Sequence, residues 1–249
     1  MGKLDGKVAW VTGGGTGIGL GAARALARAG ATLVMSGRRE AVLAAEASRI
    51  RDDGGQAEIE PLDVADPQAV KQVAERILSR HKRIDILLNS AGLNTPDRSW
   101  KSQTAEGWRN VVGINLDGSF YTVHAVLPAM RAQKDGLIIN VSSWAGVFHP
   151  RLTGAAYNGS KHAVTAMTET INMEECTNGI RACAICPAEV ATPILDRRPV
   201  PPSAEDRARM LQPDDLGQVI RFIAELPAHA CINQLIISPT WNRMYVDNL

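Results

Sequence analysis

Seven short apolar runs alternate with longer helix-like segments along the chain. The runs read KVAWVT, ATLVMS, AEIEPL, IDILLN, GLIINVS, IRACAIC and QLIIS. Several are apolar at nearly every position, which is typical of strands that helices cover on both faces. Repeated strand–helix units favour right-handed crossovers and parallel pairing of the strands. The alternation therefore predicts an α/β fold with a doubly wound, seven-stranded parallel sheet and helices on both faces.

Length and charge narrow the function classes. The chain has 249 residues, which fits one α/β domain over residues 1–249, and it has 27 Lys and Arg residues against 26 Asp and Glu. The arginines are scattered rather than gathered in a basic stripe, so we expect no nucleic-acid partner. No apolar run reaches the roughly 18 residues that span a bilayer, and the N-terminus lacks the apolar core of a signal peptide. We expect a cytoplasmic protein without a membrane partner.

One segment differs in composition from the rest of the chain. It reads TPILDRRPVPPSAEDRARMLQPDD and is rich in proline and charged residues. Inside a compact fold, a mobile flap explains such a segment better than a disordered insertion does. We therefore expect a substrate flap at about residues 193–212.

Two of the four cysteines, Cys183 and Cys186, have the C-x-x-C spacing of redox and zinc motifs. They lie in the apolar run IRACAIC, where residues three apart point to opposite faces of a strand. No second cysteine pair completes a zinc site, and the five histidines show no ligand spacing. We interpret both thiols as core side chains and expect no bound metal.

The stretch VTGGGTGIGLGAAR, residues 11–24, joins the first apolar run to a helical segment. A glycine turn between a strand and a helix offers free N–H groups and the helix dipole to a pyrophosphate. Gly13 would permit the turn, Gly17 the close approach of a phosphate, and Gly19 tight packing of the helix. The spacing T-G-x-x-x-G-x-G is one residue longer than the standard dinucleotide motif, so a purely structural turn stays open on this stretch alone.

The end of the second apolar run indicates which dinucleotide is bound. NAD-binding units carry an acidic residue there for the ribose hydroxyls, whereas this chain has VMSGRRE, with Gly37 near the acidic position. Arg38 and Arg39 could bind a 2′-phosphate through paired hydrogen bonds, and Ser36 could add a hydroxyl donor. The alternative is a solvated helix start, although cations are unfavourable there. The pattern favours NADP(H) over NAD(H).

The segment YNGSK places Tyr157 and Lys161 four residues apart at the start of another helical stretch. Side chains at i and i+4 share a helix face, so the phenol and the ammonium can converge on one site. A neighbouring ammonium lowers the pKa of a phenol towards the range where proton transfer is efficient. The pair predicts acid–base chemistry, although the spacing by itself is common on surface helices.

Taken together, five segments point to one enzyme family: VTGGGTGIG, LLNSAG, INVSS, YNGSK and CPAEVATP. In their order and spacing the chain resembles the short-chain dehydrogenases/reductases from Lys7 to about Ser238. The resemblance implies a single-domain Rossmann fold and hydride transfer between a nicotinamide cofactor and a carbonyl or secondary alcohol substrate. The chain departs from the family pattern at Ser90, where the family has Asn, and at Ala188, where it usually has Gly.

The resemblance also implies roles for individual residues. Tyr157 matches the general acid or base, and Lys161 matches the residue that lowers its pKa and binds the nicotinamide ribose. Ser143 precedes the turn SWAG and matches the serine that orients the substrate oxygen, with Ser142 as the competitor. Asn115 matches the asparagine that holds a water in the proton relay, and it is equally compatible with a buried polar residue that bends its helix.

Cofactor and substrate contacts follow from the same resemblance. The expected cofactor contacts are Gly13, Gly15, Thr16, Gly17, Ile18, Gly19, Ser36, Arg38, Arg39, Asp63, Val64, Asn89, Ala91, Gly92, Tyr157, Lys161, Pro187, Val190 and Thr192. The expected substrate contacts are Ser143, Trp144, Phe148, His149 and Tyr157, with Leu93, Asn94 and the flap around them. The family usually forms homodimers or homotetramers, and Trp241 and Tyr245 could dock on a neighbouring subunit or cover the chain's own core.

Two alternatives to an NADP(H)-dependent carbonyl reductase or alcohol dehydrogenase stay open. One is an NAD(H)-dependent alcohol dehydrogenase of the same family. The other is a non-catalytic NADP-binding regulator, which would have no need of the four catalytic matches together. The residues do not identify the substrate.

Overall fold

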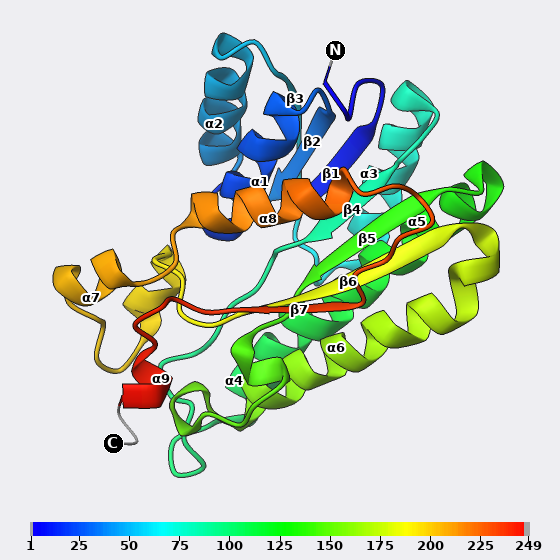
Figure 1. Cartoon of the computed structure of the whole chain (residues 1–249). Coiled ribbons are helices and arrows are strands. Elements are labelled where there is room, and N and C mark those ends of the chain that lie inside the picture. Colours follow the sequence, from blue (N-terminus) through cyan, green and yellow to red (C-terminus); the bar gives the residue numbers. More distant parts are fainter. Residues whose placement is uncertain (1, 247–249) are drawn as a thin grey trace.

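The computed structural model describes residues 2–246 and confirms the predicted sheet (Figure 1). Its strands run parallel in the order β3-β2-β1-β4-β5-β6-β7. They are β1 Val8–Thr12, β2 Thr32–Gly37, β3 Gln56–Pro61, β4 Ile86–Asn89, β5 Gly136–Val141, β6 Ile180–Pro187 and β7 Gln234–Ile237. The order reverses between β1 and β4, so this is a doubly wound Rossmann-type sheet with a ligand-binding switch point there.

Helices cover both faces of the sheet. The longer ones are α1 Gly17–Arg28, α2 Glu40–Asp52, α3 Pro67–His81, α4 Ala105–Val112, α5 Gly118–Gln133, α6 Ala155–Glu175 and α8 Pro213–Ala224. The short ones are η1 Gly113–Asp117, η2 Trp144–Gly146, η3 Arg151–Thr153, η4 Cys176–Asn178, η5 Pro193–Arg197, α7 Ala204–Arg209 and α9 Arg243–Val246. One core joins α1, α2 and α8 to the sheet, and a second joins α3, α5 and α6 to the opposite face. None of the helices within residues 2–246 is long and apolar enough to cross a membrane.

Two glycines allow α1 and α8 to lie side by side (Figure 1). A Cβ atom on Gly21 would lie 2.3 Å from the carbonyl oxygen of Pro213, and one on Gly217 would lie 2.5 Å from the carbonyl oxygen of Gly21. No side chain fits between backbones at that separation. Gly21, which is surplus to the phosphate-binding pattern, therefore serves helix packing.

The helical segment over residues 105–133 is continuous but changes its winding in the middle. The π-helical turn η1 Gly113–Asp117 joins α4 to α5 and contains the fully buried Asn115. Single π-turns inside α-helices often occur at functional sites. Asn115, the buried polar residue of this turn, therefore lies where the winding of the helix changes.

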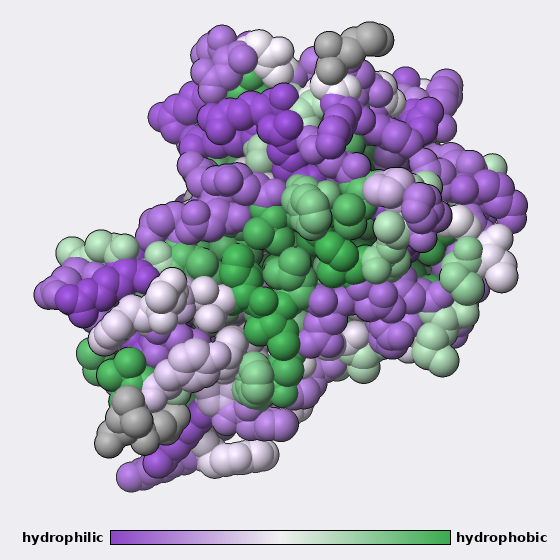
Figure 2. All heavy atoms as spheres, viewed as in Figure 1, coloured by the Kyte–Doolittle hydropathy of each residue, from purple (hydrophilic) through white to green (hydrophobic). Residues whose placement is uncertain are grey.

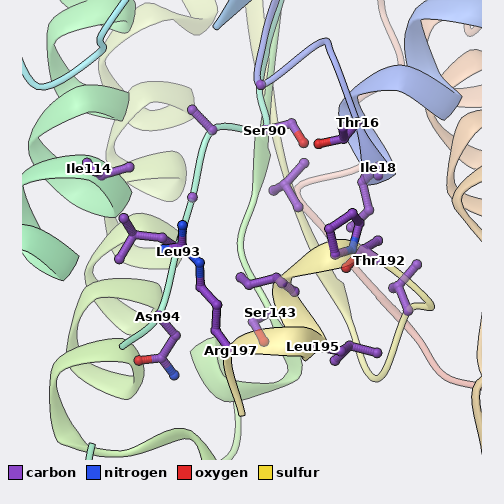
Figure 3. A pocket seen from close by; sticks show the side chains of 18 of the residues that line it. Thr16, Ile18, Ser90, Leu93, Asn94, Ile114, Ser143, Thr192, Leu195 and Arg197 are labelled. Atoms are coloured by element: carbon purple, nitrogen blue, oxygen red, sulfur yellow. The ribbon is translucent and has the colours of Figure 1, made fainter. Parts of the chain in front are cut away.

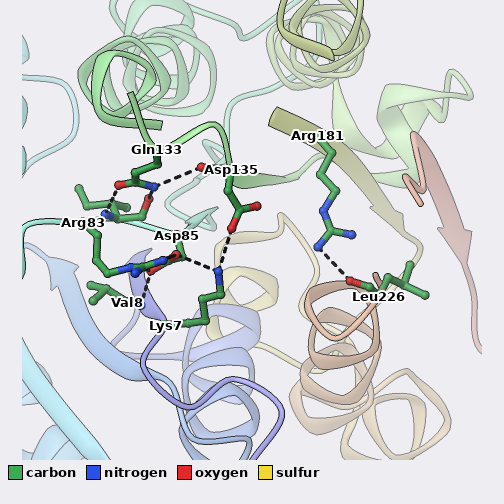
Figure 4. Close-up of polar contacts among 9 residues, drawn as sticks. Lys7, Val8, Arg83, Asp85, Gln133, Asp135, Arg181 and Leu226 are labelled. Carbon is green, nitrogen blue, oxygen red and sulfur yellow. Dashed lines mark hydrogen bonds and ion pairs between the residues drawn. The ribbon is translucent and has the colours of Figure 1, made fainter. Parts of the chain in front are cut away.

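A charged cluster secures the amino ends of the central strands (Figure 4). The buried carboxylate of Asp85 accepts hydrogen bonds from the backbone N–H of Val8 at 2.9 Å, from Lys7 at 3.1 Å and from Arg83. Burial raises the pKa of Asp85, but these donors and the cations outweigh it and hold the pKa below its ordinary value. The carboxyl ends of the strands lie at the opposite edge of the sheet, away from this cluster, where a ligand can bind.

Apolar side chains gather on the face crossed by α8 and β7, seen as the green area in Figure 2. Phe222 of α8 and Ile236 of β7 are about half exposed there.

In β6, Cys183 and Cys186 are both buried and free, and burial raises the pKa of Cys183 to about 12. Their interpretation as core side chains is confirmed.

Candidate active site

A cavity of about 500 Å³ opens at the carboxyl ends of the strands (Figure 3). It extends from the turn between β1 and α1, past the ends of β2 and β3, to the loops after β4 and β5 and to η5. The predicted cofactor residues that line it are Gly13, Gly15, Thr16, Gly17, Ile18, Arg38, Arg39, Asp63, Val64, Ala91, Gly92, Tyr157, Lys161, Pro187, Val190 and Thr192. Its volume suits a small-molecule site.

The glycine turn brings the chain close to neighbouring backbone. Gly13 has a φ of 65°, and a Cβ atom there would lie 2.7 Å from the carbonyl oxygen of Ser90. Gly17 has a φ of 56° and opens α1 beside Thr192. A Cβ atom on Gly19 would lie 2.4 Å from the carbonyl oxygen of Gly13. These residues thus permit the turn and its packing, with Gly19 behind the cavity rather than in its wall.

The start of α1 fits an anionic group. Thr16 occupies the N-cap position with no side-chain hydrogen bond to the helix, and no acidic residue stands in the first turn. The backbone N–H groups of that turn have no carbonyl partner within the helix, and the helix dipole favours negative charge there. Thr16, Gly17 and Ile18 line the cavity, so its wall matches the chemistry of a nucleotide pyrophosphate.

The end of β2 carries Arg38 and Arg39 into the cavity wall, next to Gly37. The prediction for Ser36 is wrong, because this residue is fully buried and its hydroxyl accepts a hydrogen bond from Trp10 Nε1 at 2.9 Å. Within the described residues, the nucleotide end of the wall offers two guanidinium groups at the position where NAD-binding units place a carboxylate.

Tyr157 and Lys161 share the face of α6 that borders the cavity. The Lys161 Nζ atom lies 5.7 Å from the centre of the Tyr157 ring and donates a hydrogen bond to the Val141 carbonyl at 2.7 Å. Ser143 is hydrogen-bonded to the Tyr157 hydroxyl. The Ser142 hydroxyl turns away and hydrogen-bonds the Lys161 carbonyl at 2.9 Å. The geometry therefore singles out Ser143 beside the phenol.

Burial shifts the pKa of both titratable groups of this cluster. It lowers the pKa of Lys161 to about 8 and raises that of Tyr157, against the hydrogen bond from Ser143 and the positive charges of Arg198 and Arg98. The sequence assigned this charge effect to Lys161. In the structure two arginines also favour the phenolate, and the contribution of Lys161, whose Nζ lies 5.7 Å from the ring centre, stays a prediction.

Asn115 and Asn89 lie behind the cavity wall rather than in it. The Asn115 side chain donates to the Leu93 carbonyl at 3.0 Å and accepts from the Leu93 N–H at 2.8 Å. Asn89 is buried and donates to Asn140 Oδ1 at 2.9 Å. Both residues fix the loop after β4, so they position the site without facing it. The water-holding role of Asn115 stays a prediction.

Two of the predicted substrate contacts do not line the cavity. Trp144 does, but Phe148 packs on its outer side with ring centres 4.3 Å apart, and His149 stacks on His162 at 4.7 Å. The turn of η2 directs only the first of these rings inwards. Tyr245 of α9 packs edge-on against Trp144 at 5.7 Å, so this part of the tail covers its own chain.

The sequence reasoning did not single out three arginines of the cavity wall, although two of them belong to the predicted flap. Arg98 follows β4, and Arg197 and Arg198 lie at the end of η5. The charges in the flap sequence LDRRP were a signal, but nothing local connects them with Arg98. Within residues 2–246, no group of three potential metal ligands lies together.

The cavity runs from the glycine turn after β1 to the cluster of Ser143, Tyr157 and Lys161. This arrangement is typical of Rossmann-fold oxidoreductases. The model of the short chain dehydrogenase family matches residues 7–200, and the chain belongs to this family. It is 34% identical to an uncharacterized oxidoreductase of Staphylococcus saprophyticus, over 96% of this chain and 100% of that protein.

Two solved structures are similar throughout. One is a metagenomic short-chain oxidoreductase in complex with NADP: TM-score 0.83, 30% identity, 96% of this chain and 99% of that chain covered. The other is an alcohol dehydrogenase from the archaeon Thermococcus sibiricus complexed with 5-hydroxy-NADP: TM-score 0.86, 26% identity, 95% and 98% covered.

Proposed function

We propose that the protein is an NADP(H)-dependent oxidoreductase that interconverts a carbonyl compound and a secondary alcohol. The observation that carries the proposal is the single cavity wall in which the Tyr157 phenol, Ser143 and Lys161 continue into the glycine turn. The two similar NADP-bound structures support the choice of cofactor. When bound, the nicotinamide supplies or accepts the hydride.

The chain's own residues manage the proton and the orientation of the substrate. In reduction, the Tyr157 hydroxyl protonates the carbonyl oxygen as the carbonyl carbon gains a hydride; in oxidation, the phenolate takes the proton back. Ser143 donates a hydrogen bond at the same oxygen and so polarises the C=O bond. Arg98 and Arg198 favour the phenolate, which eases the release of the proton.

The preference for NADP(H) rests on Arg38 and Arg39. A guanidinium binds a 2′-phosphate through charge-assisted hydrogen bonds worth about 1.5–3 kcal/mol, or roughly 10-fold to 100-fold in Kd. We expect Arg38→Ala to weaken NADPH binding by that factor and to leave NADH binding unchanged, measured by nicotinamide fluorescence. Arg28→Ala, at an exposed position of α1, is the matched control. Equal NADPH affinity in Arg38→Ala, or tighter binding of NADH by the wild type, would contradict the preference.

The enzymatic proposal has its own test. Turnover of a broad panel of carbonyl and alcohol substrates is followed at the nicotinamide absorbance band, for the wild type and for Tyr157→Phe. We expect Tyr157→Phe to lose turnover and keep NADPH affinity. A wild type that binds NADPH and turns over none of the panel would favour the non-catalytic regulator.

The proposal extends to the assembly and setting of the enzyme. We place it in the cytoplasm as a homodimer or homotetramer, with residues 193–212 as the substrate flap of a single domain. The half-exposed Phe222 and Ile236 support self-association through the face of α8 and β7. The four free cysteines suit a reducing compartment.

A further inference from the structure

Three arginines surround the reaction end of the cavity. Arg98 comes from the loop after β4, while Arg197 and Arg198 come from the end of η5. Arg98 Nη2 donates a hydrogen bond to the Arg197 carbonyl at 2.8 Å, across a sequence separation of 99 residues. Figure 3 shows the Arg197 side chain extending from η5 towards the loop that carries Leu93 and Asn94. The fold therefore gathers guanidinium groups where the substrate must enter.

Part of this positive charge lacks a counter-ion within the described residues. Arg98 is only 8% exposed, and its hydrogen bonds go to the neutral carbonyls of Thr95 and Arg197. No carboxylate of residues 2–246 lies within ion-pair distance of Arg98 or Arg197. Glu189, which also lines the cavity, is held by Arg198 and Arg243. A buried cation without a partner is costly and calls for an anion.

The electrostatic environment agrees with an uncompensated charge. Burial, and then the positive charge of Arg198, lower the pKa of Arg98. A guanidinium nevertheless stays charged at neutral pH. Two cations that repel one another in a partly desolvated cavity attract an anion more strongly than they would in water.

Arg98 is fixed relative to the catalytic phenol. Asn94 Nδ2 donates to the Thr153 carbonyl at 2.9 Å, which ties the loop after β4 to the chain just before α6. Gly154, with a φ of 76°, lies against the same loop, and a Cβ atom on it would lie 2.2 Å from the Arg98 carbonyl oxygen. Tyr157 follows within the first turn of α6. A group bound at Arg98 is thus held at a set place beside the reacting oxygen.

The remaining wall at this end is mostly apolar, with Leu93, Trp144 and Leu195. We propose that the substrate carries an anionic oxygen group, a carboxylate or a phosphate ester, which Arg98 and Arg197 bind while the reacting oxygen faces Tyr157 and Ser143. This substrate class rests on the proposed oxidoreductase function. It excludes neutral carbonyl compounds as the preferred substrates.

Two other uses of the arginines make different predictions. If Arg98 only ties the flap to the loop after β4, neutral and anionic substrates suffer alike when it is replaced. If Arg197 binds the cofactor, its replacement weakens NADPH binding. An anion site, by contrast, changes the ratio of kcat/KM between a charged substrate and its neutral analogue.

The test compares matched pairs of ketones with NADPH: 4-oxopentanoate against its methyl ester, and dihydroxyacetone phosphate against dihydroxyacetone. We expect at least a 10-fold preference in kcat/KM for the anion in one of the two pairs. The pair that shows it identifies the anionic group as a carboxylate or as a phosphate ester. Arg197→Gln and Arg98→Gln should each reduce this preference about 10-fold to 100-fold. Arg28→Gln is the control, because Arg28 lies at an exposed position of α1, outside both the cavity wall and the flap.

Equal kcat/KM within both pairs, or a loss confined to NADPH affinity, would overturn the anion site and leave the proposed function intact. If NADPH binds but no ketone is reduced, the proposed function fails. The anion site is then tested by ligand binding instead of turnover. Thermal shifts of the NADP-bound protein are then measured with each member of the pairs. A shift with the anion alone that Arg197→Gln removes supports the site, and its absence refutes it.

Discussion

Replacing Lys161 by methionine removes a hydrogen bond and also a buried charge. At neutral pH the variant should therefore be more stable than the loss of the hydrogen bond alone would predict. The buried ammonium has a pKa of about 8 instead of 10.5. Because the unfolded chain then binds more protons than the folded one, the wild type gains stability as the pH rises from 8 to 10.5. The shift corresponds to about 3 kcal/mol at 1.36 kcal/mol per pH unit, and most of this gain lies between pH 7 and 10.

The assay measures the free energy of unfolding in urea at several pH values for the wild type and Lys161→Met, at one protein concentration. Subtracting the two curves removes every other titration, and also the pH-independent loss of the bond to the Val141 carbonyl. The wild type should gain about 2–3 kcal/mol in unfolding free energy relative to the variant between pH 7 and 10. Lys101→Met, at an exposed position, is the control and should run parallel to the wild type.

Parallel curves for the wild type and Lys161→Met would refute the reasoning, because they would mean that burial does not penalise the ammonium. A gain towards low pH would refute it as well, since it would place the folded pKa above 10.5. Either result would also mean that burying Lys161 does not cost the folded protein stability.

Two further predictions concern packing and assembly. Gly21→Ala should destabilise the fold by about 1–3 kcal/mol in thermal or urea unfolding, because its Cβ would lie 2.3 Å from the Pro213 carbonyl oxygen. Gly159→Ala is the control: this residue faces open space on α6, so the change should stabilise the fold by up to about 1 kcal/mol. Equal effects of the two changes would contradict the close approach of α1 and α8. Ile236→Asp, on the half-exposed β7, should reduce the oligomer to a smaller species in sedimentation velocity, and an unchanged mass would exclude this face as the interface.

Local periodicity explains why the fold and part of the site were predictable. Short apolar runs that alternate with helical segments favour the strands of such a sheet, and the four-residue spacing of Tyr157 and Lys161 fixes their common helix face. The choice between Ser142 and Ser143 needed the structure, because neighbouring residues after a strand differ only in direction. The burial of Ser36 could not be read from alternation, because Val34 and Met35 point to opposite faces of β2 and both are buried.

The arginines of the substrate end were beyond the reach of such reasoning. Arg98 and Arg197 lie in loops, where no periodicity assigns a face, and their contact spans 99 residues. Only the sheet order, with β4 beside β5 and β5 beside β6, brings the loops after these strands together. Phe148 and His149 lie outside the cavity wall for a related reason: they follow the tight turn of η2, in which only Trp144 lines the cavity.

The distribution of charge connects the two ends of the site. The whole chain carries a formal net charge of only +1, yet Arg38, Arg39, Arg98, Arg197 and Lys161 all line one cavity. Burying positive charge of this kind costs stability in the free protein, because desolvation lowers the pKa of both Lys161 and Arg98. Ligands that carry negative charge at both ends, a phosphorylated nucleotide and an anionic substrate, relieve that cost when they bind. The same charges would therefore strengthen and orient the binding of both proposed reactants.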